Sequence, residues 1–327
     1  EAHRLNRKSG LFSNLGENQV MEIIRASKLS IFFLDEDQRI AFSDIGAYEA
    51  LASWGQPLGA PIHRARLSSQ FRCNGSDGYL AWLDSALQLR ETANPTLDGV
   101  DYDIQVFDSP VALREKIFQK NLRANKARMV AGYCWKWVSK KNPAATDIQI
   151  EEFGFEAQWN LSKDGSLWII SPDSVREVGC IHTCQGLEVD YIGVIIGPDF
   201  VVRDGKAITD ASKRDGRDKT IQGFKKRLEE DPEAARAQAD LIIKNTYRTL
   251  MTRGQKGCYL FCTDQETRDY FTELLARRET PENTTSEARY PGLVLEILPE
   301  AKVLPYEHSV PVFDLKAAAG DFSAYQA

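Results

Sequence analysis

The chain has 327 residues, 43% of them hydrophobic and 27% charged, which is ordinary for a soluble globular protein with one large or two medium-sized domains. Its 41 basic and 47 acidic residues give a net charge of −6, so any nucleic-acid binding must use local patches. The longest apolar runs, such as IFFL and YIGVIIG, are too short to span a bilayer. Six cysteines and no evident signal peptide predict a cytoplasmic protein with reduced thiols and no membrane partner.

Apolar runs of strand length alternate along the chain with segments of helical periodicity. The predicted strands are 28–34, 65–71, 102–107, 128–135, 166–171, 177–183, 189–197 and 257–263. The predicted helices are 44–54, 78–89, 110–124, 232–252 and 264–278. Ser43 or Asp44 is the expected cap of the first helix, and Ser109 followed by Pro110 begins the third. Strands separated by helices indicate an α/β fold with a mostly parallel, doubly wound sheet.

Two segments interrupt this alternation. Residues 201–227 carry nine Lys or Arg against four Asp; Asp204-Gly205 predicts a hairpin turn, and the remainder is predicted to be a mobile basic loop or a solvated run of charge. Residues 279–291 are polar and predict a linker, after which the chain to residue 327 is expected to begin a further module.

Cysteines occur in two pairs, Cys180-x₃-Cys184 and Cys258-x₃-Cys262, and His182 lies inside the first. This raises the alternative of a zinc site. The second pair lies in the strand-like GCYLFCTD, and x₃ spacing differs from the tight CxxC of zinc knuckles. Buried, unreactive thiols are therefore the favoured interpretation.

Four short motifs lie near the ends of the predicted elements: DEDQRI, QFRC, HTCQGLEVD at 182–190 and YRTLMTRG at 247–254. Their order and kind resemble the ATP-driven motor of superfamily 1 helicases, in the branch called the Schlafen group 3-like DNA/RNA helicase domain. The resemblance runs from residue 1 to about 278. It implies RecA-like, doubly wound parallel sheets: the rear part of a first motor lobe over 1–60, and a complete second lobe over 61–278 with the basic insertion at 201–227.

The first residues, EAHR, resemble the end of the family's Walker B motif, DEAHR, which places the leading Asp one residue before Glu1. No G-x-x-x-x-G-K-[ST] sequence occurs in the 327 residues. The resemblance therefore implies that the phosphate-binding loop and most Mg²⁺ ligands lie upstream, in a missing N-terminal part of the same protein.

ATP hydrolysis requires positioning of the phosphoryl group and neutralisation of its charge. By resemblance, Glu1 orients and deprotonates the attacking water, and Gln38 senses the γ-phosphate. Arg72 and Arg253 are the expected transition-state cations, because a guanidinium is permanently charged and forked. Tyr247 is followed by Arg248 where the family has a small residue, which leaves open which arginine points inward.

Further nucleotide contacts are expected from Asp35, Gly186 and Glu188; Gly186 would let the backbone approach a phosphate, and Glu188 would hold the ribose or orient an arginine. His182 and Thr183 are expected to couple this loop to nucleic acid.

Two stretches predict nucleic-acid contacts. Trp135 and Trp137, interleaved with lysines, are typical of a base-stacking platform, and a buried pair is the alternative. The basic segment adds Lys213, Arg214, Arg217 and Lys219. We thus expect an ATP- and Mg²⁺-dependent motor on single-stranded or partly duplex nucleic acid. The competing hypothesis is a catalytically inactive nucleic-acid-binding or regulatory module on a motor fold.

Overall fold

The structure is a computed structural model that describes residues 2, 5–6, 8, 16–65, 73–92, 96–160, 168–169, 171–184 and 188–277. The chain divides into two units, Glu1–Glu279 and Thr280–Ala327, and the second lies outside the described residues. The predicted strands 65–71 and 166–171 also lie largely outside them.

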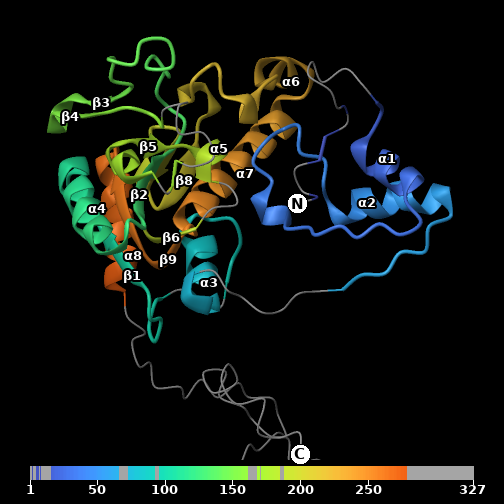
Figure 1. Cartoon of the computed structure of the whole chain (residues 1–327), viewed down its shortest axis with the longest axis horizontal. Coiled ribbons are helices and arrows are strands. Elements are labelled where there is room, and N and C mark those ends of the chain that lie inside the picture. Colours follow the sequence, from blue (N-terminus) through green and yellow to red (C-terminus); the bar gives the residue numbers. More distant parts are fainter. Residues whose placement is uncertain are drawn as a thin grey trace, which may run out of the picture. The chain divides into compact units, whose positions relative to one another are not determined.

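A five-stranded parallel sheet forms the centre of the first unit (Figure 1). Its order is β1-β9-β6-β2-β5, comprising β1 (Asp103–Val106), β9 (Gly254–Cys262), β6 (Val189–Ile196), β2 (Ala127–Ala131) and β5 (Val178–Gly179). All four neighbouring pairs are parallel, as in a RecA-like sheet. The α/β prediction is therefore confirmed.

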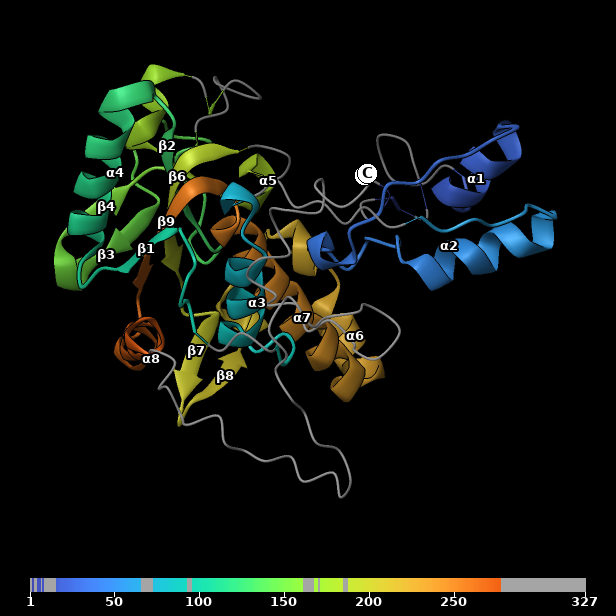
Figure 2. The same ribbon diagram turned by 90° about the horizontal axis from the view of Figure 1, so that it is seen from below.

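Helices cover both faces of the sheet because the central strands are apolar on both sides. Ile192, Val194 and Ile196 of β6 pack with α3 (Asp77–Ala86) and α7 (Pro232–Met251). Figure 2 shows α4 on the opposite side of the sheet from α3 and α7.

The opposite face packs against α4 (Pro110–Ala124), whose Leu113 and Ile117 share a core cluster with Ile195 of β6. Gly193 permits this close approach, since a Cβ there would lie 2.8 Å from the Ile117 side chain.

The helices begin where the sequence supplies caps. The Ser109 hydroxyl accepts from the Val111 N–H at 3.1 Å, with Pro110 as the first residue of α4. Asp231 caps α7 through the Ala234 N–H at 3.1 Å, and Asp264 caps α8 (Gln265–Ala276). The predictions of these three helices are confirmed.

Residues 28–34 do not form the predicted strand. Leu29, Ile31 and Phe33 are 78%, 71% and 66% exposed, and no strand pairs with this segment in the described part of the chain. Among the described residues, one backbone bond reaches it, from the Ala2 N–H to the Phe33 carbonyl at 2.8 Å. An apolar sequence of strand length lacks here the hydrogen-bonded ladder that would make it a strand.

Three other boundaries differ from expectation. The helix predicted at 44–54 is α2 (Tyr48–Gly55), because the Asp44 carboxylate instead accepts from the Ile40 and Ala41 N–H groups. The strand predicted over 128–135 ends at Ala131. The strand predicted over 177–183 divides into β5 and the short helix α5 (Ile181–Cys184).

The basic segment is folded, so the prediction of a mobile loop is wrong. It contains the hairpin β7 (Phe200–Arg203) and β8 (Lys206–Thr209), whose turn at Asp204-Gly205 has φ angles of 50° and 72° as predicted. Two 3₁₀ turns follow, η8 (Ala211–Lys213) and η9 (Lys219–Ile221), and then α6 (Phe224–Glu230).

Within the first unit, residues 16–65 contact the part that contains the five-stranded sheet mainly through polar groups. They contain α1 (Gln19–Ala26), η2 (Glu36–Gln38), α2 and η3 (Gln56–Leu58), and their only apolar side chains in the buried core are Val20 and Ile40. The Phe42 N–H donates to the Thr220 carbonyl at 2.9 Å, and the Phe42 ring stacks on Phe224.

Several further short elements were not predicted from the sequence. They are the antiparallel hairpin of β3 (Ile148–Ile150) and β4 (Phe155–Ala157), and the 3₁₀ turns η4 (Cys73–Gly75), η5 (Glu151–Phe153) and η7 (Pro172–Arg176).

Candidate functional site

Two of the sequence motifs meet at the amino ends of β6 and β9. The Val189 N–H donates to the Arg253 carbonyl at 2.9 Å, and the Gln255 amide is hydrogen-bonded to the Glu188 carboxylate. Parallel pairing of the two strands brings HTCQGLEVD and YRTLMTRG side by side. Glu188 and Arg253 therefore lie on neighbouring segments.

Arg253 is held by the last turn of α7. The side chain is buried, and its Nε donates to the Thr249 carbonyl at 2.9 Å. Carbonyls at a helix C-terminus carry partial negative charge and stabilise a cation. The guanidinium is thus fixed beside the amino edge of the sheet.

Asp35 and Gln38 come together in the turn formed by LDEDQR. Gln38 is buried, and its Nε2 donates to Asp35 Oδ2 at 2.5 Å within η2. The Asn245 amide of α7 donates to the Arg39 carbonyl at 3.1 Å. The turn is therefore fixed against the helix that leads into Arg253.

Four charged side chains form a junction cluster between η2, α3 and α7: Asp37, Asp84, Arg90 and Arg248. Arg248 Nε lies 2.5 Å from Asp84 Oδ1, and its Nη2 lies 3.5 Å from Asp37 Oδ2. Arg90 contacts the same two carboxylates at 3.1 and 2.6 Å. Burial disfavours the charge on Arg248, but Asp84 and Asp37 outweigh it and raise the guanidinium's pKa.

Sequence reasoning missed this junction cluster. Its signal was Asp84, a lone carboxylate inside the apolar helix GYLAWLDSALQL, which is buried in the structure. A charged residue on a buried helix face requires a partner.

His182 and Thr183 lie on α5, after the carboxyl end of β5. The Thr183 hydroxyl donates to Asn160 Oδ1 at 2.6 Å, and His182 Nε2 lies 3.9 Å from Asp218 Oδ1. The motif HTCQGLEVD therefore begins near the carboxyl edge of the sheet and ends at its amino edge.

Arg214 is the centre of a buried cluster with Asp199 and Asp218. Its Nε lies 3.0 Å from Asp218 Oδ2 and 3.4 Å from Asp199 Oδ2, and all three side chains are 0% exposed. Burial disfavours the charge on Arg214, but Asp218 and Asp199 outweigh it and raise its pKa. For Asp218, burial is outweighed by His182 and Arg214, and the carboxyl pKa is lowered.

Arg214 was expected to contact nucleic acid, but its guanidinium is instead paired with the buried carboxylates of Asp199 and Asp218. Lys213, Arg217 and Lys219 are exposed on the same segment.

Trp135 and Trp137 surround the buried Trp159, at ring distances of 6.4 Å each. Both are partly buried, and Lys140 Nζ lies 5.6 Å from the Trp137 ring centre. Each indole packs on the core, as in a buried pair, and keeps some exposure, as a base-stacking platform requires.

Glu1, Arg72 and Gly186 lie outside the described residues. No group of three or more His, Cys, Asp or Glu side chains within the described ranges could hold a metal ion. All six cysteines are free, and burial raises the pKa of the Cys180 and Cys184 thiols. In the described ranges, no helix is both long and apolar enough to cross a bilayer.

Residues 1–264 match the family model of the Schlafen group 3 DNA/RNA helicase domain. Among known proteins, the chain is similar to Uncharacterized protein YPL245W of Saccharomyces cerevisiae, with 24% identity over 300 residues. The match covers 82% of this chain and 62% of the yeast protein, so the chain spans less than two thirds of that relative. No solved structure matches the chain. Because the family model covers well over half of the sequence, the chain belongs to the Schlafen group 3 DNA/RNA helicase domain family.

Proposed function

We propose that this chain is part of an ATP-driven nucleic-acid motor of superfamily 1 type. Its nucleotide-facing side is the amino edge of β6 and β9, together with η2. The observation that carries the proposal is the adjacency of Glu188 and Arg253, which come from motifs far apart in the sequence.

Arg253 is the transition-state cation in this proposal. Phosphoryl transfer spreads negative charge over the phosphate oxygens, and a fixed guanidinium stabilises that charge. Arg248 is less suited to the role because Asp84 and Asp37 already neutralise it. Of the two arginines considered, we assign Arg253, because its carbonyl accepts from the Val189 N–H, next to Glu188.

Arg72 is the second cation in the proposal. Its neighbour in sequence, Cys73, has its thiol 3.8 Å from the carbonyl of Thr252, the residue before Arg253. This contact supports a common location for QFRC and MTRG.

Gln38 and Asp35 supply the amide and carboxylate that face the nucleotide from the other side. The Asn245–Arg39 bond and the junction cluster connect η2 to α7. A movement of η2 is thereby transmitted to α7, the helix that leads into Arg253.

ATP is the substrate and Mg²⁺ the metal that the family implies; bound Mg²⁺ would neutralise phosphate charge. The described residues form no cluster suited to Mg²⁺, so none is assigned as its ligand. Glu1 is the proposed base for the attacking water.

The test is ATPase activity with and without single-stranded nucleic acid. The 327 residues contain no phosphate-binding loop sequence, so this chain alone should hydrolyse no ATP. A longer form of the protein that includes such a loop should show nucleic-acid-stimulated hydrolysis.

In the longer form, Arg253→Ala should lower turnover about a thousandfold with nucleotide affinity nearly unchanged. Arg236→Ala, which changes an exposed arginine on α7, is the matched control. Nucleic-acid binding without any ATP hydrolysis would instead support the catalytically inactive module. Normal turnover of Arg253→Ala would remove that residue from the site.

A further inference from the structure

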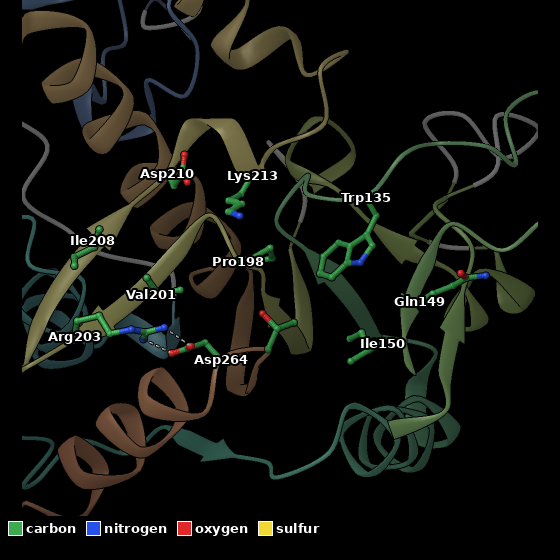
Figure 3. Close-up of a pocket in the computed structure, with 11 residues that line it drawn as sticks. Trp135, Gln149, Ile150, Pro198, Val201, Arg203, Ile208, Asp210, Lys213 and Asp264 are labelled. Carbon is green, nitrogen blue, oxygen red and sulfur yellow. Dashed lines mark hydrogen bonds and ion pairs between the residues drawn. The ribbon is translucent and has the colours of Figure 1, made fainter. Parts of the chain in front are cut away.

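A groove of about 590 Å³ lies at the carboxyl ends of β6 and β9, opposite the edge that carries Arg253 (Figure 3). Pro198 and Asp264, which follow these two strands, are among its lining residues. Trp135 and Ile150 line one side, and Val201 of β7 and Lys213 line the other. This volume falls within the range of about 300–1,000 Å³ that is usual for binding pockets.

The aromatic wall is held in place by the core. The Trp159 indole N–H donates to the Trp135 carbonyl at 3.2 Å, and the two rings lie 6.4 Å apart with an interplanar angle of 58°. Figure 3 shows the Trp135 indole pointing into the groove. A stacking surface is therefore present before any ligand binds, which lowers the entropy cost of binding.

The backbone at Lys213 is also held in place. Lys213 is the last residue of η8, and the next residue, Arg214, is locked by Asp199 and Asp218. The Asp215 N–H donates to the Tyr133 carbonyl at 2.9 Å, which connects this turn to the loop that carries Trp135. The buried cluster of Arg214, Asp199 and Asp218 thus positions the backbone of the exposed Lys213, which lies across the groove from Trp135.

Of the other three charges of the groove, Arg203 and Asp264 pair with each other, and Asp210 keeps its negative charge. Arg203 Nη1 and Nη2 lie 2.7 and 2.6 Å from the Asp264 carboxylate oxygens. Asp210 accepts from the Ser212 N–H and hydroxyl at 2.8 and 2.6 Å. Within the described residues, no carboxylate forms an ion pair with the Lys213 ammonium.

We propose that this groove binds single-stranded nucleic acid, with one unpaired base stacked on Trp135 and a neighbouring phosphate at Lys213. Lys213 is the lining cation without an ion-pair partner among the described residues, so it can contact one phosphate of a strand, whereas the Asp210 carboxylate disfavours a free nucleoside triphosphate with its several charges. Apolar walls and few base-reading groups predict weak sequence preference. This inference rests on the proposed function, because a nucleic-acid motor is what would bring a single strand to the groove.

The structure distinguishes the two tryptophans. Trp135 lines the groove, whereas Trp137 is not among its lining residues and packs on Tyr133 and Trp159. Trp137 is therefore a matched control that belongs to the same aromatic cluster.

The experiment measures binding of the 327-residue chain to a short oligothymidylate that carries one 2-aminopurine. Stacking on an indole quenches the fluorescence of that base. Trp135→Leu should abolish the quenching and weaken binding about 5- to 100-fold, as expected for loss of one base–aromatic stack. Trp137→Leu should retain the quenching.

Lys213→Ala should lower the slope of log affinity against log salt by about 0.7, because one phosphate of a single strand is no longer neutralised by the protein. Lys225→Ala, an exposed lysine on α6, should leave the slope unchanged.

Circular dichroism checks that each variant is folded. A second measurement uses only the wild-type protein and so does not depend on the folding of a variant. An oligonucleotide with abasic sites should bind the wild-type chain as weakly as the normal strand binds Trp135→Leu. Equal wild-type affinity for abasic and normal strands would overturn the proposal, as would a folded Trp135→Leu with unchanged quenching.

The motor can fail separately. If nucleic acid stimulates ATPase in the longer form while folded Trp135→Leu binds normally, the groove proposal alone is refuted. If quenching depends on Trp135 but no ATPase is found, the groove stands and the motor is refuted.

Discussion

The two arginine clusters contain the same kinds of side chain in opposite environments. Arg214 and its two aspartates are completely buried, whereas in the junction cluster Arg248 is 11% exposed, Asp37 is 35% exposed and Arg90 is 48% exposed. A sealed pair cannot change partners without exposing unpaired charge to a low-dielectric interior. A partly exposed pair can, because water solvates each charge as the pair separates. Burial therefore decides which cluster is a fixed support and which can take part in movement.

The largest expected effect comes from opening the buried cluster. Arg214→Ala leaves Asp199 and Asp218 buried without their cation, and should lower the free energy of unfolding by about 3–5 kcal/mol. Denaturant unfolding of the 327-residue chain measures it. Arg217→Ala, exposed on the same segment, should change stability by less than about 0.5 kcal/mol. Similar losses for the two variants would contradict the description of a sealed cluster.

Opening the junction cluster should lower the free energy of unfolding by less than opening the buried cluster does. Arg248→Ala leaves Arg90 as a remaining partner of Asp84 and Asp37, so we expect a loss of about 1–2 kcal/mol in the free energy of unfolding. Raising the salt concentration should shrink this loss, because Asp37 and Arg90 reach solvent, where charges are screened. The effect of Arg214→Ala should not depend on salt. Equal salt dependence of the two variants would contradict the distinction between a buried and a partly exposed cluster.

The exposed charges next to the buried cluster should affect binding and not folding. Neutralising Arg217 and Lys219 together should flatten the salt dependence of single-strand affinity, by about 0.7 for each phosphate that these side chains neutralise. Fluorescence anisotropy at several salt concentrations measures this slope. An unchanged slope would place the nucleic acid away from the segment.

The smallest effect concerns Asp264, whose pKa is lowered to about 2, chiefly by its hydrogen bonds from Arg203, against the opposing effect of burial. A depressed carboxyl pKa stabilises the fold above pH 3.8, and this contribution is lost as the pH falls towards 2. Since solvent screens the pair, Asp264→Asn should cost only about 0.5–1 kcal/mol at neutral pH.

Asparagine keeps the helix cap of α8, so the variant tests the charge alone. Its unfolding free energy should vary less than that of the wild type between about pH 4 and pH 2. Asp101→Asn, which is exposed, is the control. Parallel pH curves for Asp264→Asn and the wild type would contradict the assignment.

Local signals in the sequence predicted the sheet and its helices well. β6 and β9 are apolar on both faces, and Asp231-Pro232 and Asp264 mark the starts of α7 and α8. Residues 28–34 have an equally apolar sequence, but a strand also requires a neighbouring backbone, and periodicity carries no information about that neighbour.

The site was predictable in its residues more than in its geometry. The motifs identified Glu188 and Arg253, but their adjacency depends on the pairing of β6 with β9, which the sequence does not state. For segment 201–227, charge content predicted a mobile loop, whereas Arg214, Asp215 and Asp218 turn inward and Lys213 and Arg217 turn outward. Composition cannot distinguish a paired charge from a solvated one.

The attachment of residues 16–65 has a consequence for how the molecule opens. With Val20 and Ile40 as their only apolar side chains in the core, these residues have little hydrophobic burial to oppose detachment. Regions of this kind open in sub-global fluctuations well below the free energy of complete unfolding. Amide hydrogens of α1 and α2 should therefore exchange with solvent long before those of β6 and β9. Gln38 then belongs to the first cooperative unit to open, whereas Arg253 adjoins β9 in the last unit to open.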